Sequence, residues 1–466
     1  MPPSEYIKNK KVLIMGLGLL GGGIATTKWL VKHGAKVTVT DLKSRADLAG
    51  SIKALGPAIK KVKLVLGKHN ESDFKNNQII VVNPAVPKES PFLKIAREAG
   101  VTLENEATLF FNLCSSPIIA VTGTRGKTTT VNWILHFLNQ KYPNSVLTGN
   151  SSDSPMLGVL DGLDGQSPVV VELSSWHLEL LPVSKKSPHI SVITNIYPDH
   201  LNRYKNLTAY AQAKANIFKH QTKNDFLILN KKNPWTKFFL KQSASWRTKS
   251  KIIYSSIVKP PGFNKSFVQH LVLNMGEHNL QNLVIAALAA NLAGVDWNLI
   301  KKAVKTLPQI KFRQEIIYQK DGLTIVNDTT ATSPDATIAA LNRFAYRGST
   351  SIVLITGGTS KNLEFNPPVG GWARAVKKHI KPANLFLLDG SATKKMLDSL
   401  GEKYFKKSRP QLYLDFNILL TSALKHAKLI KGKKVLLFSP SAASFEKFKN
   451  EFDRGERFNQ FFKERS

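Results

Sequence analysis

Short apolar runs alternate with longer segments of helical period along most of the chain. Parallel strands are joined by helices and are buried on both faces, so they appear as near-continuous apolar runs. The alternation therefore predicts α/β domains with mainly parallel sheets. The runs that we interpret as strands are "KVLIMG", "AKVTVTD", "QIIVVN", "PIIAVTG", "PVVVELSS", "ISVITNI", "DFLILN", "LTIVND", "SIVLITGG", "NLFLLD" and "KVLLFSP".

Length and proline positions predict where the domains divide. The chain has 466 residues, and domains typically contain roughly 100 to 200 residues. A new strand opens at Pro117, and a proline ends the helical pattern in "VKTLPQIK". We therefore predict three domains, at residues 1–109, 110–308 and 309–466.

The first predicted strand leads into a glycine-rich turn, "VLIMGLGLLGGG". Gly16, Gly18 and Gly21 form G-x-G-x-x-G before a helical segment, and Asp41 closes the next strand. Such a turn lets the backbone approach a diphosphate, and an acid at Asp41 is typical of ribose binding. The alternative is that the glycines only permit close packing of the helix on the sheet. The motif does not specify the nucleotide, so a nicotinamide-dependent oxidoreductase stays open.

A second turn, "VTGTRGKTTT", follows the predicted strand "PIIAV". Val121 stands where a generic phosphate loop has its first glycine, so this is a shorter variant. We expect the N–H groups from Gly123 to Lys127 to face a β-phosphate, Lys127 to neutralise phosphate charge and Thr128 to bind Mg²⁺. The turn therefore predicts an ATP site.

Three further polar clusters follow in the same predicted domain, "VVVELSSWHLE", "VITNIYPDHLNRY" and "YAQAKANIF". Glu172 and His200 are candidate Mg²⁺ ligands, because they fall near strand ends, where open parallel sheets bind ligands.

Composition indicates the cellular compartment that we expect but does not identify a binding partner. Residues are 42% hydrophobic and 21% charged, and there is no apolar run of roughly 18 residues that would indicate a membrane span. The N-terminus lacks the apolar core of a signal peptide, and Cys114 is the single cysteine, so we expect a reducing cytoplasm. The net charge of +34 favours anionic partners. The lysines are scattered and no nucleic-acid-binding motif is visible, so we expect no specific nucleic acid. A basic nucleic-acid-binding protein without enzymatic activity remains the alternative from another class.

Several of these segments together resemble the Mur ligase family, the ATP-dependent amide-forming enzymes of peptidoglycan synthesis. They are "TGTRGKTTT", "ELSSWHLE", "NIYPDHLNRY", "HNLQN" and "NDTTATSPDAT", and the resemblance covers essentially the whole chain in order. It implies a Rossmann-like N-terminal domain, a central P-loop ATPase domain and a Rossmann-like C-terminal domain. "GLGLLG", "TGGTSKNLEF" and "FSPSAASFEKFKNEFDRGERF" are most similar to the branch that adds D-glutamate to UDP-N-acetylmuramoyl-L-alanine. The glycine motif of the first domain argues against a folylpolyglutamate-type ligase.

The resemblance also implies roles for individual residues. It implies ATP binding by Gly123, Thr124, Arg125, Gly126, Lys127, Thr128, Thr129, Asn150, Asn279, Asn282, Arg313 and Asp328. It implies up to two Mg²⁺ ions held by Thr128, Glu172, His200 and Lys214, with Lys127, His200 and Lys214 as catalytic residues. It implies UDP-sugar binding by Gly18, Leu19, Leu20, Asp41, Lys43 and Asn83, and glutamate binding by Thr332, Lys361 and Ser444.

Lys214, in "YAQAKANIF", matches a family position at which a lysine is carbamylated by CO₂. A surface lysine is the alternative on burial statistics alone. The sequence also departs from the family pattern: Ser151 and Ser152 interrupt the loop after Asn150, Thr330 stands where a lysine is common, and Asn202 where an aspartate is common. We expect a monomer. Because D and L amino acids carry the same carboxylates, the sequence leaves the stereochemistry of the added amino acid open, and another Mur-type ligase, for example one adding L-glutamate, is the alternative function.

Overall fold

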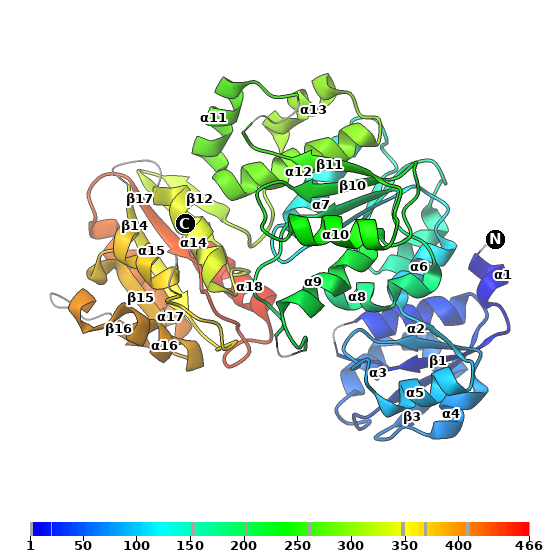
Figure 1. The fold of residues 1–466 in the computed structure, drawn as a ribbon. Coiled ribbons are helices and arrows are strands. Elements are labelled where there is room, and N and C mark those ends of the chain that lie inside the picture. The colour runs from blue at the N-terminus through cyan, green and yellow to red at the C-terminus, as the bar shows by residue number, and fades with distance from the viewer. Residues whose placement is uncertain are drawn as a thin grey trace. The chain divides into compact units, whose positions relative to one another are not determined.

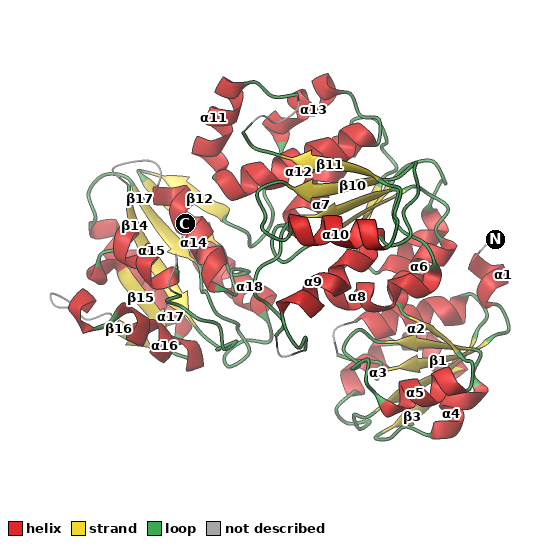
Figure 2. Ribbon diagram, viewed as in Figure 1, coloured by secondary structure: helices red, strands yellow, loops and turns green. Residues whose placement is uncertain are grey.

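The computed structural model contains three β-sheets with helices around them (Figures 1 and 2). It describes residues 3–19, 21–150, 154–201, 203–258, 262–345, 350–367, 371–405 and 411–465. The chain forms two compact units, and the first comprises Met1–Gly262 and Gln281–Leu307. The second comprises Phe263–Leu280 and Pro308–Ser466.

The first unit contains two sheets, and the earlier in the chain is a five-stranded sheet in the order β3-β2-β1-β4-β5. All of its pairings are parallel, as expected for a Rossmann-like domain. Its strands are β1 (Lys11–Met15), β2 (Lys36–Asp41), β3 (Val62–Leu66), β4 (Ile79–Val82) and β5 (Thr102–Glu104). The helices of this part are α1 (Pro3–Ile7), α2 (Gly22–Lys32), α3 (Ala49–Ala54), α4 (Glu71–Asn76), α5 (Pro91–Glu98) and α6 (Glu106–Leu113).

The second sheet of this unit has six strands in the order β11-β10-β9-β6-β8-β7, again all parallel. Its strands are β6 (Ile118–Thr122), β7 (Val146–Gly149), β8 (Val169–Glu172), β9 (Ile190–Ile193), β10 (Phe226–Asn230) and β11 (Lys251–Ser255). The helices of this part of the chain are α7 (Lys127–Leu138), α8 (Ser175–Leu180), α9 (Leu207–Ala215), α10 (Thr236–Ser245), α12 (Glu277–Leu292) and α13 (Trp297–Ala303).

The second unit contains the third sheet, in the order β12-β13-β17-β14-β15-β16. Only the edge strand β12 is antiparallel to its neighbour in this sheet. Its strands are β12 (Glu315–Lys320), β13 (Leu323–Asn327), β14 (Ser351–Gly357), β15 (Leu385–Leu388), β16 (Gln411–Tyr413) and β17 (Lys434–Phe438). Its helices are α11 (Lys265–Met275), α14 (Pro334–Ala345), α15 (Trp372–His379), α16 (Ser391–Leu400), α17 (Phe416–Leu429) and α18 (Glu451–Lys463).

Burial on both faces of the sheets explains the apolar runs. In the third sheet, alternate strand residues belong to two separate cores. Leu354 and Leu437 lie in one, and Ile355 and Phe438 lie in the other. Helices cover both faces of such a sheet, so every position of a central strand is apolar. The predicted α/β class is confirmed, and each of the eleven apolar runs forms a strand.

The chain divides into two compact units, and this division does not test the three predicted domains. The second unit resumes at Pro308, the proline that the sequence indicated, but it also includes Phe263–Leu280. The first unit contains both earlier sheets, which share one core cluster, so the boundary between 109 and 110 stays a prediction. Within the described residues, none of the helices has the length and apolarity needed to cross a bilayer.

Candidate active site

The glycine turn predicted from "GLGLLG" connects β1 to α2. Gly16 and Gly18 adopt positive φ angles of 93° and 67°, a region that other residues rarely adopt. A Cβ on Gly16 would lie 3.0 Å from the Cβ of Asn83, and a Cβ on Gly23 would lie 2.3 Å from the carbonyl oxygen of Leu17. Glycine is therefore required both for the turn and for the close approach of α2 to the turn. Gly23 lies outside the motif, so its contact does not address the packing alternative raised above for Gly16, Gly18 and Gly21.

Two polar side chains fix the shape of this turn. The carboxylate of Asp41, at the end of β2, accepts hydrogen bonds from the N–H groups of Gly18 at 3.2 Å and Lys43 at 2.9 Å. The side-chain amide of Asn83 donates to the carbonyl oxygen of Gly16 at 3.2 Å. Asp41 thus organises the turn in addition to any contact with a ribose.

The other predicted substrate residues of this turn are exposed where the structure describes them. The Leu19 side chain is exposed, and so is Lys43. Leu20 lies outside the described residues.

The phosphate loop predicted from "TGTRGKTTT" connects β6 to α7, and the helix begins at Lys127. Gly126, directly before it, is left-handed with φ 80°. A Cβ there would lie 2.3 Å from the side-chain oxygen of Asn282, and a Cβ on Gly123 would lie 2.0 Å from the hydroxyl oxygen of Thr194. Both glycines are required by their surroundings, and the loop leads directly into the N-terminus of α7.

This loop is fastened to the segment that follows β9. The N–H of Thr124 donates to the backbone carbonyl oxygen of Asn195 at 2.9 Å, and the N–H of Arg125 donates to the side-chain oxygen of Asn195 at 2.8 Å. The hydroxyl of Thr194 donates to the carbonyl oxygen of Arg125 at 2.7 Å. Two of the N–H groups that we expected to face a phosphate are therefore already used within the protein.

Arg125 is paired with an acid in the same segment. Its guanidinium lies 2.9 Å from the carboxylate of Asp199, and a quarter of the Arg125 side chain is exposed. Arg125 thus forms an ion pair beside the loop, and its expected contact with ATP stays a prediction.

Lys214 lies behind the loop, in α9, and is only 1% exposed. Its ammonium group donates to the carbonyl oxygen of Gly123 at 3.0 Å and to the hydroxyl of Thr122 at 3.4 Å, and it lies 4.6 Å from the centre of the Tyr210 ring. Burial, reinforced by repulsion from Lys127, holds the pKa of the Lys214 amine well below its usual range. The alternative of a surface lysine is wrong.

The candidate metal ligands follow two strands, β8 and β9, that are separated by β6 in the sheet. Glu172 ends β8, is buried, and accepts a hydrogen bond of 3.4 Å from the side-chain amide of Asn150, which follows β7. His200 follows β9, has φ 53° and a side chain that is 41% exposed, and packs near Trp176 and Tyr210.

A metal cage made of protein alone is not formed. Among the described residues, no group of three or more His, Cys, Asp or Glu side chains is arranged to hold a metal ion. Mg²⁺ at nucleotide sites usually takes one or two carboxylates, a hydroxyl, water and substrate phosphates. Glu172 and the Thr128 hydroxyl fit that pattern, since both lie beside the phosphate loop.

The two asparagines of "HNLQN" fall in different compact units. Asn282 is buried and packs its side chain against Gly126 of the phosphate loop. Asn279 lies three residues earlier in α12, within the second unit.

Asp328, in the second unit, is buried and its carboxylate is engaged internally. It accepts hydrogen bonds from the N–H of Gln314 at 3.1 Å and the hydroxyl of Ser439 at 2.8 Å. Burial raises the pKa of Asp328 to about 7. Arg313, directly before Gln314 in the sequence, is half-buried. The Thr330 hydroxyl donates to the carbonyl oxygen of Phe312 at 2.8 Å.

The residues expected to bind glutamate do gather in this unit. The Lys361 ammonium group donates to the Thr332 hydroxyl at 3.0 Å. Thr359 and Ala443 pair through two backbone hydrogen bonds of 2.9 and 3.0 Å, which brings the segment before Lys361 beside the segment of Ser444.

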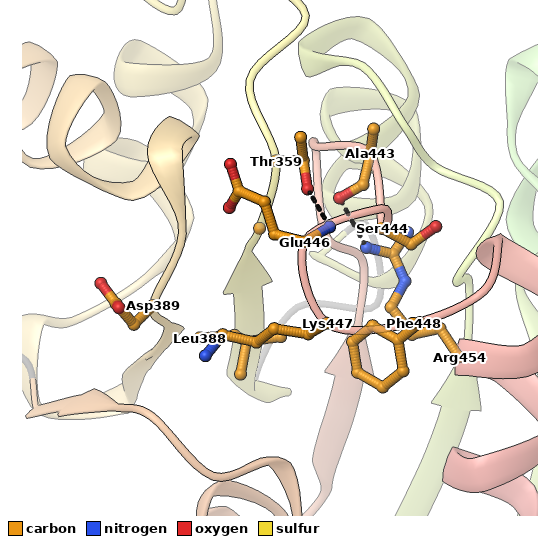
Figure 3. Close-up of a pocket in the computed structure, with 10 residues that line it drawn as sticks. Thr359, Leu388, Asp389, Ala443, Ser444, Glu446, Lys447, Phe448 and Arg454 are labelled. Atoms are coloured by element: carbon orange, nitrogen blue, oxygen red, sulfur yellow. Dashed lines mark hydrogen bonds between the residues drawn. The ribbon is translucent and has the colours of Figure 1, made fainter.

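Ser444 lines a small pocket in this region (Figure 3). It is 3% exposed, and its hydroxyl has no hydrogen-bond partner among the described residues. A buried hydroxyl normally has a partner, and the pocket beside the Ser444 hydroxyl leaves no space for a water-sized molecule. The other lining residues include Gly358, Thr359, Asp389, Glu446 and Arg454.

Comparison with known proteins finds family matches around both glycine turns. Residues 121–290 match the Mur ligase middle domain, and residues 10–104 match the N-terminal domain of Mur ligases of the MurD-like type. A Roseiflexus relative named UDP-N-acetylmuramoylalanine–D-glutamate ligase is 37% identical over 97% of this chain and 98% of its own. The chain belongs to the Mur ligase family. A relative of the same name from Borreliella afzelii is 36% identical over 98% of each chain.

Solved Mur ligases share the fold of this family member. MurF ligase from Thermotoga maritima, in complex with ADP, has a TM-score of 0.55 at 15% identity and covers 99% of this chain and 97% of its own. MurF from Acinetobacter baumannii also has a TM-score of 0.55, at 14% identity, over 95% and 90% of the two chains.

Sequence reasoning missed some residues that shape the Mur ligase site. Asn195 and Asp199 lie in "NIYPDH", from which only His200 was selected. The available signal was that polar residues follow a buried strand. Tyr210 occupies the turn of α9 before Lys214, and its helical spacing of four residues was the corresponding signal.

Proposed function

We propose that this Mur ligase joins D-glutamate to UDP-N-acetylmuramoyl-L-alanine with consumption of ATP, in the synthesis of peptidoglycan precursors. The observation that carries the proposal is the near-full-length similarity to relatives that bear this name. It spans both glycine turns and the amino-acid side of the second unit, so no part of the reaction lacks a matching region. The cytoplasm is the expected compartment, and a monomer with three domains is the expected form.

The chemistry requires activation of a carboxylate, because a carboxylate is a poor electrophile. Attack of the substrate carboxylate oxygen on the γ-phosphorus of ATP would form an acyl phosphate and release ADP. The amine of glutamate would then attack the acyl carbon, the new C–N bond would form, and inorganic phosphate would leave with the bonding electron pair. The glutamate ammonium must lose a proton before or during this attack.

The phosphate loop supplies the charge for the first step. Lys127, at the N-terminus of α7, is the group we expect to stabilise negative charge on the transferred phosphoryl. When bound, Mg²⁺ would screen the repulsion between the phosphate oxygens. Glu172, His200 and the hydroxyl of Thr128 are the side chains that would hold it, and we expect two such ions.

Lys214 fits a role as a carbamate. Its amine is buried, has a lowered pKa, and lies behind the loop that we expect to hold the phosphates. Carbamate formation joins the neutral amine nitrogen to the carbon of CO₂ and releases one proton, so a depressed pKa favours it. The product is a carboxylate-like oxygen donor of the type that Mg²⁺ prefers.

The remaining residues divide among the three substrates. We expect the UDP-sugar at Gly18, Leu19, Leu20, Asp41, Lys43 and Asn83, where backbone N–H groups and α2 favour a diphosphate. We expect ATP at the phosphate loop from Gly123 to Thr129, with further contacts from Asn150, Asn279, Asn282, Arg313 and Asp328. The internal hydrogen bonds of Asp328 favour an indirect role for that residue. Glutamate is assigned to Thr332, Lys361 and Ser444.

Release of inorganic phosphate tests the function. The purified chain is given ATP, Mg²⁺ and UDP-N-acetylmuramoyl-L-alanine, and a panel of D- and L-amino acids is added one at a time. We expect phosphate release with D-glutamate and a product of the matching mass. Release with L-glutamate alone would assign the chain to another Mur-type activity, and release with none of the amino acids would contradict a ligase.

A further inference from the structure

Arg454, in α18, is one of the largest fully buried side chains of the protein, with 0% exposure. Burying a charge is costly unless it is hydrogen-bonded or paired. The four hydrogen bonds of its guanidinium go to carbonyl and hydroxyl oxygens. Nε donates to the Thr329 hydroxyl at 3.0 Å, Nη1 to the Ala443 carbonyl oxygen at 3.1 Å, and Nη2 to the carbonyl oxygens of Thr329 at 2.8 Å and Ala442 at 3.2 Å.

These acceptors belong to two separate loops. The 329–332 loop follows β13 and carries Thr332, and the 441–444 loop follows β17 and carries Ser444. The guanidinium binds both loops at once, and Figure 3 shows its bond to the carbonyl oxygen of Ala443. Arg454 therefore joins the two loops to which we assign glutamate binding.

The 441–444 loop requires such support. Ser441 is buried and has φ 58°, a left-handed conformation that costs a non-glycine residue roughly 1 kcal/mol or more. Its hydroxyl donates to that of Thr337 at 2.6 Å, which shares a hydrogen bond of 2.8 Å with the Ser439 hydroxyl. One side of the loop is thus held by hydroxyl groups and the other by the Arg454 guanidinium.

Arginine is the residue type that this geometry requires. Its planar fork presents several N–H donors at fixed angles, whereas a lysine presents a single flexible ammonium group. Lysine at 454 would keep the charge but could not bind Thr329 and both alanine carbonyls in the same plane. Burial lowers the pKa of Arg454 to about 9, so the group stays charged at neutral pH.

We propose that Arg454 is a positioning residue for the incoming amino acid, setting the distance between the 329–332 loop and the 441–444 loop so that Thr332 and Ser444 can bind one glutamate together. The inference rests on the proposed function and adds to it a residue that does not itself touch the substrate. A small displacement of either loop would weaken glutamate binding more than binding of ATP or the UDP-sugar, because the phosphate loop and the turn after β1 lie in the first unit.

The test is a set of steady-state kinetics on the full chain, with the KM of each substrate measured separately. Arg454→Lys removes the fork, and Arg457→Lys, three residues along the same helix and more than half exposed, is the matched control. For Arg454→Lys we expect the KM for D-glutamate to rise by about tenfold or more, with the KM values for ATP and UDP-N-acetylmuramoyl-L-alanine within about threefold of wild type. Arg457→Lys should leave all three unchanged.

A second variant covers the case in which Arg454→Lys does not fold. Thr329→Val removes the hydroxyl that accepts from Nε and donates to the carbonyl oxygen of Glu451 but keeps the shape of the side chain, so we expect a selective rise of about threefold in the KM for D-glutamate. An unchanged KM for D-glutamate in whichever folded variant is measured, or an equal rise for all three substrates, overturns the positioning role. Absence of D-glutamate ligation in the wild type would instead refute the proposed function, so the two failures are distinguishable.

Discussion

The two glycine turns of the first unit occupy the same topological place, between a central parallel strand and the helix that follows it, but they differ in the charge around them. The turn after β1 is held by the Asp41 carboxylate and the Asn83 amide. The turn after β6 has Lys127 at the start of its helix, Arg125 within it and buried Lys214 behind it. The turn after β6 thus has cationic side chains within it and at the start of its helix, one of them paired with Asp199, whereas the turn after β1 is held by a carboxylate and an amide.

This difference indicates that the two turns have different functions. Backbone N–H groups and a helix N-terminus suffice to bind a diphosphate that does not react. Phosphoryl transfer also needs positive charge where negative charge develops. We therefore assign substrate holding to the turn after β1 and phosphoryl transfer to the turn after β6.

The largest expected effect comes from Lys127→Ala. We expect ATP-dependent phosphate release to fall by about a thousandfold or more, because charge stabilisation in the transition state is lost. Circular dichroism should show an intact fold. Lys223→Ala, at an exposed position in the same unit, is the control and should release phosphate at the wild-type rate. Near-normal turnover in Lys127→Ala would remove the ATP assignment.

Lys214→Ala is expected to lose nearly all activity, about a hundredfold or more, because an oxygen donor beside the phosphates disappears. Added acetate or formate should restore part of the rate by occupying the vacated position. Lys205→Ala, an exposed lysine close in sequence, serves as control. Unimpaired activity of Lys214→Ala would refute the carbamate, whereas failed rescue alone would show only that the small acid binds weakly.

Gly126→Ala should raise the KM for ATP by about tenfold or more, because its φ of 80° is unfavourable for alanine and the new Cβ would meet the Asn282 side chain at 2.3 Å. Gly21→Ala is the counterpart in the other turn. It also has positive φ, but no atom lies within 4 Å of its Cβ, so backbone strain of roughly 1 kcal/mol is the only expected cost. An equal rise in the KM for ATP in both variants would contradict the assignment of ATP to the turn after β6.

The smallest effect is expected from Asp41→Asn. The amide keeps one oxygen for the N–H of Gly18 or of Lys43 but not both, so the turn after β1 should loosen. We expect the KM for UDP-N-acetylmuramoyl-L-alanine to rise by about three- to tenfold, with an unchanged KM for ATP. A change confined to the KM for ATP would reverse the assignment of the two turns.

The strands show how far the sequence alone predicts the fold. The eleven apolar runs are the interior strands of the three sheets, and the six strands that the runs did not reveal, β3, β5, β7, β11, β12 and β16, are all sheet edges. An interior strand is apolar on both faces. An edge strand such as β12 is only partly buried, so its sequence lacks a continuous apolar run.

The residues of the candidate site could likewise be predicted only in part from the sequence. Lys127 and Gly126 could be predicted because the phosphate loop is a local motif. The pairing of Arg125 with Asp199 joins positions 74 residues apart, and the bonds of Arg454 to Thr329 join positions 125 apart. Such contacts depend on strand order and loop placement, which composition and spacing do not encode.

The division of labour between the two turns is tested most directly by calorimetric titration of both nucleotides into two variants, Lys127→Ala and Gly16→Ala. The account predicts that Lys127→Ala binds UDP-N-acetylmuramoyl-L-alanine as the wild type does but loses affinity for ATP, and that Gly16→Ala shows the opposite pattern. Loss of both affinities in either folded variant, or loss of ATP binding in Gly16→Ala alone, would contradict it.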